Sequence, residues 1–372
     1  VVSNATCENQ DKIISGNEKV LTPRLQDAMF FYENDIKNKL SNQGLDKVIF
    51  INKLGSIQDK INRESKIVSI LSKMYSIDEG ITSRAVELSK SDLMSEMVYE
   101  FTELQGIMGY YYALNMQEDE KVALAIKEQY LPISENGDLP SNLYSAIIAI
   151  SSKLDLIFSL FSIKMIPTGS KDPYALRRAS IGIIRIISKF NLSLDLEQIF
   201  KEISPIYENT IFYTDIKNFF NDRFSGFMDT NQSVINAVLY TKEANIINII
   251  DKIKALDSLV KQDSFKNNFS FIKRISNILN KEKNIQEVHT SLFDNNYEQT
   301  LYEDFRKIQN QTFDTYLAQL EALFSLEKSL ANFFENVMVN SEDSNIKINR
   351  ISLLNEIDLE FKKIANILLV SV

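Results

Sequence analysis

The chain has 372 residues, too many for one ordinary core, so two or three domains are expected. Hydrophobic residues make up 44% and charged residues 24%, a balance that excludes a disordered chain and is typical of a soluble globular protein. The net charge of −9 argues against a general nucleic-acid binder, so any such contact must come from local basic patches. Cys7 is the only cysteine and His289 the only histidine, which excludes an intramolecular disulfide and argues against a zinc site.

The hydrophobic pattern shows no membrane segment and no targeting sequence. No run approaches the ~20 apolar residues that a helix needs to cross a bilayer. Residues 1–7 have neither the basic nor the apolar stretch of a signal peptide. We therefore expect a cytoplasmic protein that enters no membrane. Because the chain starts with Val1 and not with methionine, we also expect it to be part of a longer protein.

Apolar residues recur at steps of three and four along most of the chain, as one buried helical face requires. In the segment 142–163 they are Leu143, Ala146, Ile147, Ile150, Leu154, Ile157, Phe158 and Phe161. The segments 177–190 and 351–368 repeat this pattern, and we expect helix through 297–330, which lacks glycine and proline. With 10 glycines, 6 prolines and few alternating patterns, the sequence predicts a mostly α fold.

Proline and glycine mark the breaks between the helical blocks. Residues 132–140 and 167–173 form two loops, and a polar patch covers residues 257–268. These breaks predict a helical domain to about residue 190, a helical connecting region to about residue 255, and a helical domain after that.

The common catalytic signatures are missing from the sequence. It has no G-x-G-x-x-G fingerprint and no Walker A loop. A Ser-His-Asp or Cys-His arrangement would depend wholly on His289, which lies in a polar stretch and is interpreted as a surface histidine. No other nucleotide-binding motif is evident in the sequence.

Several motifs follow one another in order along the chain, and PTGSKDPYALRRA at residues 167–179 is the most specific of them. A second long motif is EFTELQGIMGYYYA at residues 100–113. The other segments are 16–18, 27–31, 90–93, 128–132, 153–155, 273–278, 333–339 and 349–350. Together these motifs resemble the β subunit of bacterial glycyl-tRNA synthetase.

The resemblance implies an α2β2 enzyme with separate tasks for its two kinds of subunit. The α subunit would hold a class II site that uses ATP, Mg and glycine, while the β subunit would bind tRNA(Gly). It implies no catalytic residue and no cofactor in this chain, and neither DNA nor membrane as a partner. It also implies the end of a truncated N-terminal region at 1–20, an HD-like helical domain at 21–190, a helical connecting region at 191–255, and a helical anticodon-binding domain at 256–372, similar to that of arginyl-tRNA synthetase.

A working HD phosphohydrolase needs histidine and aspartate ligands that converge on a metal. Asp155 lies where the last aspartate of such a domain would be, but residues 1–288 contain no histidine. Ser152 and Gln129 also replace an acidic residue and a histidine that the family often carries. We therefore predict no metal site, with Lys153 and Asp155 on the polar side of a buried helix.

The loop at 167–178 brings three cations next to a helix that should begin near residue 174. These are Lys171, Arg177 and Arg178. Asp172 is expected as the N-cap, with Pro173 at the first helical position. Cations are not favoured at a helix N-terminus, so the two arginines need a partner. Either an internal carboxylate or a tRNA phosphate could serve.

The densest basic stretch lies near the C-terminal third, and its members are Lys261, Lys266, Lys273, Arg274, Lys281 and Lys283. The interleaved Phe265, Phe269 and Phe271 have helical spacing, which is more typical of core residues than of base-stacking rings. Lys273, Arg274, Asn277 and Arg350 are candidate tRNA contacts. The alternative for Arg350 is an ion pair with Glu356 or Asp343.

The sequence thus predicts a subunit that positions tRNA(Gly) for glycylation by a separate chain. Two other functions stay open. One is a metal-dependent phosphohydrolase of the HD type, which the missing histidines disfavour. The other is a helical scaffold that has lost its RNA function.

Overall fold

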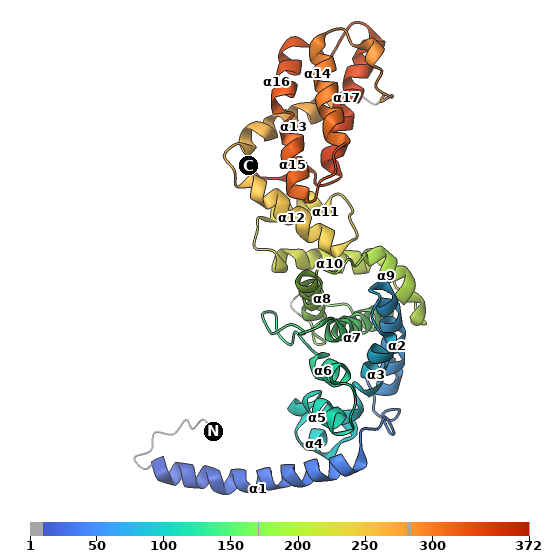
Figure 1. The fold of residues 1–372 in the computed structure, drawn as a ribbon, viewed down its shortest axis with the longest axis vertical. Helices are drawn as coiled ribbons and strands as arrows, with labels where there is room; N and C mark the ends of the chain where they lie inside the picture. The colour runs from blue at the N-terminus through green and yellow to red at the C-terminus, as the bar shows by residue number, and fades with distance from the viewer. Residues whose placement is uncertain (1–9, 170, 281–283, 372) are drawn as a thin grey trace. The chain divides into compact units, whose positions relative to one another are not determined.

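The computed structural model describes residues 10–169, 171–280 and 284–371, and the regular elements within them are all helices (Figure 1). Extended pairing in these ranges is limited to isolated bridges, such as Thr168 with Lys171 and Asp195 with Asn245. The prediction of a mostly α chain is therefore confirmed.

The chain divides into two compact units. Unit 1 comprises residues 1–186 and 200–216, and unit 2 comprises residues 187–199 and 217–372. The divisions fall inside three helices: α8 (Leu176–Phe190), α9 (Leu196–Ile203) and α10 (Tyr213–Phe227). The finer division into four segments stays a prediction, and each unit is described by itself below.

Unit 1 is built around a long apolar helix, α7. Its other elements are α1 (Gln10–Asn38), α2 (Ile57–Met74), α3 (Glu79–Leu88), η1 (Ser91–Met94), α4 (Glu96–Glu100), η2 (Thr102–Leu104), α5 (Ile107–Asn115), α6 (Glu120–Glu128), the first part of α8 and η3 (Ser204–Ile206). Helices α2, α3 and α6 pack against α7 (Figure 1).

Helix α7 (Leu143–Ser162) matches the segment predicted at 142–163. Asn142 caps it, accepting a hydrogen bond of 3.0 Å from the Ser145 amide. Ile147, Ile150 and Phe158 are fully buried. The expectation that no run is long enough to span a bilayer is wrong for this helix by length and composition. However, 78% of its apolar window is buried inside the protein, as in the core helix of a globular domain.

Unit 2 is a second bundle. Its helices after α10 are α11 (Gln232–Leu239), α12 (Ile246–Val260), α13 (Phe265–Leu279), η4 (Thr290–Leu292), α14 (Asn296–Gln309), α15 (Tyr316–Phe324), α16 (Glu327–Asn336), α17 (Ser344–Lys362) and η5 (Ile367–Leu369). Helix α12 packs on α15, and α13 packs on α16 and α17. Phe305 and Phe333 are fully buried in this core.

The expectation of continuous helix through 297–330 is wrong, because this stretch contains parts of three helices. Helix α14 ends at Gln309, and α15 begins only at Tyr316. Thr315 caps α15, and its hydroxyl accepts from the Ala318 amide at 3.2 Å. Short polar side chains offer the backbone such local bonds in place of helical ones, so a helix can break without glycine or proline.

Arg350, predicted as a tRNA contact or as a partner of Glu356 or Asp343, lies inside unit 2. Its Nε donates to Glu298 Oε1 at 2.7 Å and its Nη2 to Oε2 at 3.2 Å. The Arg350 side chain is 5% exposed and that of Glu298 is 1% exposed. Asp294 lies 3.6 Å from Nη2 and is exposed. The internal ion pair is therefore the interpretation that the structure favours for Arg350, with Glu298 as the partner in place of Glu356 or Asp343, and the RNA contact of Arg350 stays a prediction.

The two acidic residues that the sequence offers as partners of Arg350 have other contacts in the structure. Glu356 pairs with Arg306 at 2.6 Å. Asp343 caps α17, where its Oδ1 accepts from the Asn345 amide at 2.8 Å. Both Arg350–Glu298 and Arg306–Glu356 join α14 to α17, but the second pair is less buried, with side chains 32% and 25% exposed.

We expect Arg350→Met to destabilise unit 2 by about 3–5 kcal/mol, because it leaves the buried Glu298 carboxylate without its cation. Urea unfolding followed by circular dichroism measures the loss. Arg306→Met is the matched control, since the same two helices lose a more exposed pair, and it should cost about 1 kcal/mol or less. Equal losses in the two variants would contradict the burial argument.

Candidate functional sites

A pocket in unit 2 brings two of the predicted contacts together. Arg274 and Asn277 are one helical turn apart on α13, and both are exposed. They line a pocket of about 580 Å³. Its other lining residues are Ile278, Phe334, Val337, Met338, Val339, Asn340 and Lys347. The pocket thus joins residues of the segment 273–278 to residues of the segment 333–339.

Arg274 is held in place by the end of α16. Its guanidinium carbon lies 4.2 Å from the centroid of the Phe334 ring. Its Nη2 also donates to the Phe334 carbonyl at 3.3 Å. A guanidinium stacked on an aromatic ring keeps its plane fixed while its edge can still donate. Together with the Asn277 amide, it can read the edge of a planar base or hold a phosphate.

The lining of this pocket does not include the other described residues of the basic stretch, which are Lys261, Lys266 and Lys273. Lys273 is exposed on α13, next to Arg274. Lys261 pairs with Asp257 at 2.6 Å, and this carboxylate raises the pKa of the lysine. Lys281 and Lys283 lie outside the described residues.

Of the three phenylalanines in the basic stretch, Phe265 packs in the core. Phe265 is 3% exposed and lies edge-on to Phe324 with a centroid distance of 6.0 Å. Phe269 and Phe271 are half-buried. His289 is exposed, as the sequence predicts.

The loop at 167–178 places its three cations differently. Lys171 is exposed and lines a small pocket of about 170 Å³ beside Pro173. Arg177 donates to the Gly169 carbonyl, and Arg178 donates to the Ile133 carbonyl at 3.2 Å. Within the described ranges, both arginines therefore bond to backbone carbonyls and not to the internal carboxylate considered as one alternative. The RNA role of the three cations stays a prediction.

The expected start of α8 is wrong by about one half-turn. The helix begins at Leu176, after Ala175 with φ +55°, so Pro173 is not its first residue. Asp172 still serves the helix start, since its two carboxylate oxygens accept from the amides of Leu176 at 2.9 Å and Arg177 at 3.0 Å. The carboxylate at the helix N-terminus offsets the unfavourable position of the arginines.

Cationic side chains surround Asp155 in unit 1. Lys60 Nζ lies 2.9 Å from Asp155 Oδ2, and Arg63 Nε lies 2.7 Å from Oδ1. The Tyr207 hydroxyl also donates to Oδ1 at 3.0 Å. The described residues contain no group of three or more His, Cys, Asp and Glu side chains that could hold a metal. The absence of a metal stays a prediction, and the side-chain cations on Asp155 support it.

A second carboxylate in the same cluster, Glu64, shares Lys60 with Asp155. Lys60 Nζ lies 2.9 Å from Glu64 Oε1, and Lys90 Nζ lies 3.7 Å from Oε2. Burial alone would raise the pKa of Glu64, but Lys60 and Lys90 outweigh it and lower the pKa to about 2. Sequence reasoning missed Lys60 and Glu64, because an i,i+4 pair of opposite charges is more typical of a solvated helix face.

Lys153 is the cation of this cluster that no carboxylate neutralises within the described residues. Its Nζ donates to the carbonyls of Leu131 at 2.7 Å and Tyr130 at 3.2 Å. Burial, with the nearby ammoniums of Lys90 and Lys60, lowers the pKa of Lys153 to about 7. The expectation that Lys153 lies on the polar side of a buried helix agrees with the bonds of its Nζ, although its side chain is buried.

We expect the stability of the protein to rise with pH above 7 because of Lys153. Between the folded pKa of about 7 and the ordinary value of 10.5, the unfolded chain holds a proton that the folded chain has lost. The free energy of unfolding should therefore increase from pH 7 to pH 9, by up to about 1.4 kcal/mol per pH unit, relative to Lys153→Met. Urea titrations of both chains across this range test it, and parallel pH profiles would contradict it.

The comparisons with known proteins identify relatives across the whole chain. The family model described as "Glycyl-tRNA synthetase beta subunit" matches residues 1–240, more than half of the sequence. The glycine–tRNA ligase beta subunit of Helicobacter pylori (strain Shi470) is 44% identical over 388 residues, covering 99% of this chain and 55% of the relative.

Two further relatives carry the same name. The Coxiella burnetii (strain Dugway 5J108-111) protein is 38% identical, covering 100% of this chain and 56% of its own length. The Haemophilus influenzae (strain PittEE) protein is 36% identical, covering 98% and 55%. The chain therefore spans about half the length of the curated relatives it matches. The family model and these alignments agree with the ordered motifs, and the chain belongs to the glycyl-tRNA synthetase beta subunit family.

Proposed function

We propose that this chain is the tRNA-binding part of the β subunit of a glycine–tRNA ligase. It holds tRNA(Gly) in the cytoplasm while a separate α subunit of class II type uses ATP and Mg to esterify the 3′ end with glycine, in an α2β2 assembly. Family membership supports this proposal, and so does the name "beta subunit" of the relatives, which implies a partner subunit.

The observation that carries the RNA-binding part of the proposal is the pocket at Arg274 and Asn277. An arginine stacked on Phe334 and an amide one turn away form a compact surface of donors and acceptors. Single-stranded bases are recognised by such stacking and by hydrogen bonds to their edges. We assign this pocket to the anticodon, whose bases are unpaired and can enter it.

Contacts to tRNA phosphates would come from exposed cations, one in each unit. Lys273 is such a cation beside the pocket, and Lys171 is another on the loop of unit 1. Because the net charge of the chain is −9, general attraction opposes binding, and affinity must come from these local groups.

The HD-type phosphohydrolase is the rival function, and the contacts of Asp155 weigh against it. A metal ligand must offer a free lone pair, whereas Lys60, Arg63 and Tyr207 already take both oxygens of this carboxylate. A lapsed scaffold differs from the proposed function only in RNA binding, which the experiments below measure.

We expect the purified chain to be inactive in glycine-dependent ATP–pyrophosphate exchange and in charging of tRNA(Gly). The physical reason is that it lacks an ATP-binding signature, and the adenylate would form on the α subunit. Both assays are run with and without an added glycyl-tRNA synthetase α subunit. Exchange by the chain alone would contradict the division of tasks.

For the pocket, we expect Arg274→Gln and Asn277→Ala each to cost about 1–3 kcal/mol in binding tRNA(Gly) and to reduce discrimination against altered anticodons. Filter binding of wild-type and variant chains to tRNA(Gly) with intact and altered anticodons gives both quantities.

The matched control for the pocket variants is Lys273→Gln, because Lys273 is exposed on the same helix but does not line the pocket. It should weaken all tRNAs alike and lower the salt slope of binding by about one unit. The assignment of the anticodon to this pocket fails if Arg274→Gln behaves in the same way as Lys273→Gln.

A further inference from the structure

Unit 1 contains a second pocket to which the proposed function assigns no role. It measures about 490 Å³, within the range of small-molecule sites. Its lining comes from the segment before α2, from α2, from residues 102–105, from residues 129–133, from α7 and from the start of α8. The cations of the lining are Lys60, Lys153 and Arg178, and its aromatic residues are Phe50, Tyr130 and Tyr174.

The cations of this pocket differ in how the described part of the chain neutralises them. Lys60 is neutralised by Glu64 and Asp155. Lys153 is 8% exposed and donates to two backbone carbonyls, and the described ion pairs give it no carboxylate partner. Because burial lowers the pKa of Lys153 to about 7, an anion bound in the pocket would stabilise its protonated form.

The neighbours of Lys153 fix its position against the pocket. A Cβ added to Gly182 on α8 would lie 2.9 Å from Lys153 Cε and 3.2 Å from Pro132 Cγ, so the lysine stem fills the space that this glycine leaves. Arg178 lies one turn earlier on α8. Its Nη1 donates a hydrogen bond to the Ile133 carbonyl, and its side chain is exposed and lines the pocket. Glu103, the acidic residue of the lining, is also exposed.

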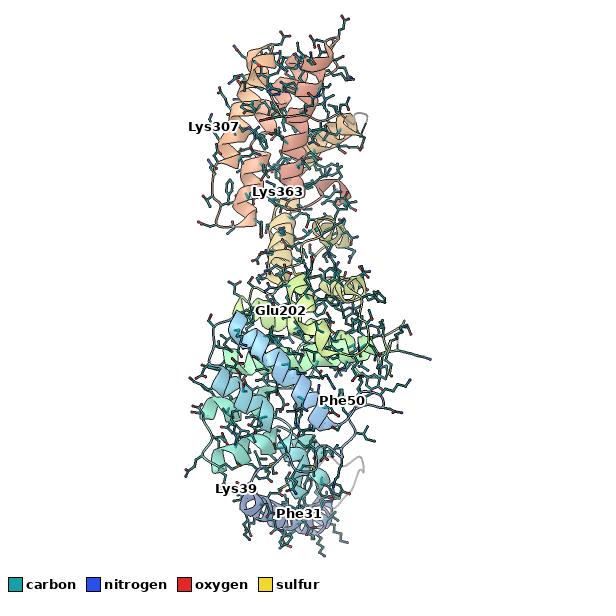
Figure 2. The ribbon with its side chains drawn as sticks, turned by 90° about the vertical axis from the view of Figure 1, so that its right-hand side faces the viewer. Phe31, Lys39, Phe50, Glu202, Lys307 and Lys363 are labelled. Atoms are coloured by element: carbon teal, nitrogen blue, oxygen red, sulfur yellow. The ribbon has the colours of Figure 1, made fainter. Side chains whose placement is uncertain are left out.

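Besides the polar side chains of Thr102, Gln105, Gln129 and Ser152, the lining has an apolar and aromatic part. Phe50, just before α2 in the chain (Figure 2), has its ring centroid 4.7 Å from Lys60 Nζ. The Tyr130 ring has Lys90 Nζ 5.0 Å from its centroid, and its hydroxyl accepts from Gln105 Nε2 at 2.5 Å. Contacts with fixed cations and amides hold these two rings in place. Leu156, Ala175 and Ala179 add apolar lining, so a bare phosphate would leave most of the pocket unfilled.

We propose that this pocket binds a free nucleotide, with the phosphate on Lys153 and Arg178 and the planar base against the aromatic lining. Phosphate is the anion that suits an ammonium and a guanidinium placed together. A base gains from contact with aromatic faces. The site goes beyond the proposed tRNA-binding function and is built wholly from residues of unit 1.

The test is isothermal titration calorimetry of the whole 372-residue chain with AMP, GMP, CMP and UMP. At least one of them should bind at one site per chain. The matching nucleoside without phosphate, and inorganic phosphate alone, should each bind at least about tenfold more weakly, because each makes only half of the contacts. The proposal is overturned if none of the four binds, or if inorganic phosphate binds as tightly as the nucleotides.

Variants locate the site. Lys153→Met should lower the affinity for the nucleotide at least about tenfold, since a hydrogen bond to a charged group is lost. Arg178→Gln should weaken it by a smaller factor and, because Arg178 is exposed, should leave the fold intact. Arg185→Gln is the matched control: Arg185 is on the same helix and donates to the Glu135 carbonyl at 2.6 Å, but it does not line the pocket. Wild-type affinity in both Lys153→Met and Arg178→Gln would overturn the assignment.

A titration in the presence of saturating tRNA(Gly) separates a free nucleotide from a nucleotide of bound RNA. Nucleotide binding should persist, and its complete loss would mean that the pocket holds part of the RNA instead. A chain that binds nucleotide but not tRNA would contradict only the proposed tRNA-binding function, so the two failures can be told apart.

Discussion

A fully buried carboxylate has to be neutralised, and the neutralisation of Asp155 organises unit 1. The cations come from α2, where Lys60 and Arg63 are close enough in sequence to reach the same carboxylate. This contact ties α2 to α7, the two helices whose side chains form the base of the nucleotide pocket. Lys60 then lies between Asp155 and Glu64, so that neither acid is left with a buried charge of its own.

The same arrangement explains why Lys153 is exceptional. Lys60, Arg63 and Lys90 pair with Glu64 and Asp155. Lys153 instead donates to carbonyls and lies near the ammoniums of Lys60 and Lys90, whose effect on its pKa the charge of Glu64 offsets only in part. Burying the aliphatic part of a lysine costs little free energy, whereas burying its ammonium costs much more. In this chain Lys153 lines a pocket. The burial of the Lys153 ammonium, which opposes folding, therefore occurs at a place where a bound anion would be stabilised. That coincidence, and not the lowered pKa by itself, is the reason to look for a ligand there.

Much of the local structure of this chain could be predicted, because helical periodicity depends on neighbours three and four residues apart. Helix α7 matches the predicted segment at both ends, and Arg274 and Asn277 were candidates because they are both polar and near in sequence. The pocket they line could not be predicted, since Phe334 and Met338 come from another helix end about sixty residues later. The break between α14 and α15 could not be predicted from glycine or proline, because residues 310–315 contain neither. Helix α14 ends at Gln309, and the Thr315 hydroxyl caps the start of α15 by accepting from the Ala318 amide.

For Arg274 and Arg350, the residue type alone does not predict whether the side chain is buried or exposed. Both were candidates as arginines within family-like motifs, yet one lines a pocket and the other is buried against Glu298. The difference lies in what surrounds each guanidinium: α14 brings a buried carboxylate to Arg350, whereas α16 brings an aromatic ring and a carbonyl to Arg274. A carboxylate takes up the donors of an arginine, while a ring leaves its edge able to donate. Because acidic residues outnumber basic ones in this chain of net charge −9, an arginine that stays exposed and stacked on a ring is the more informative sign of a binding surface.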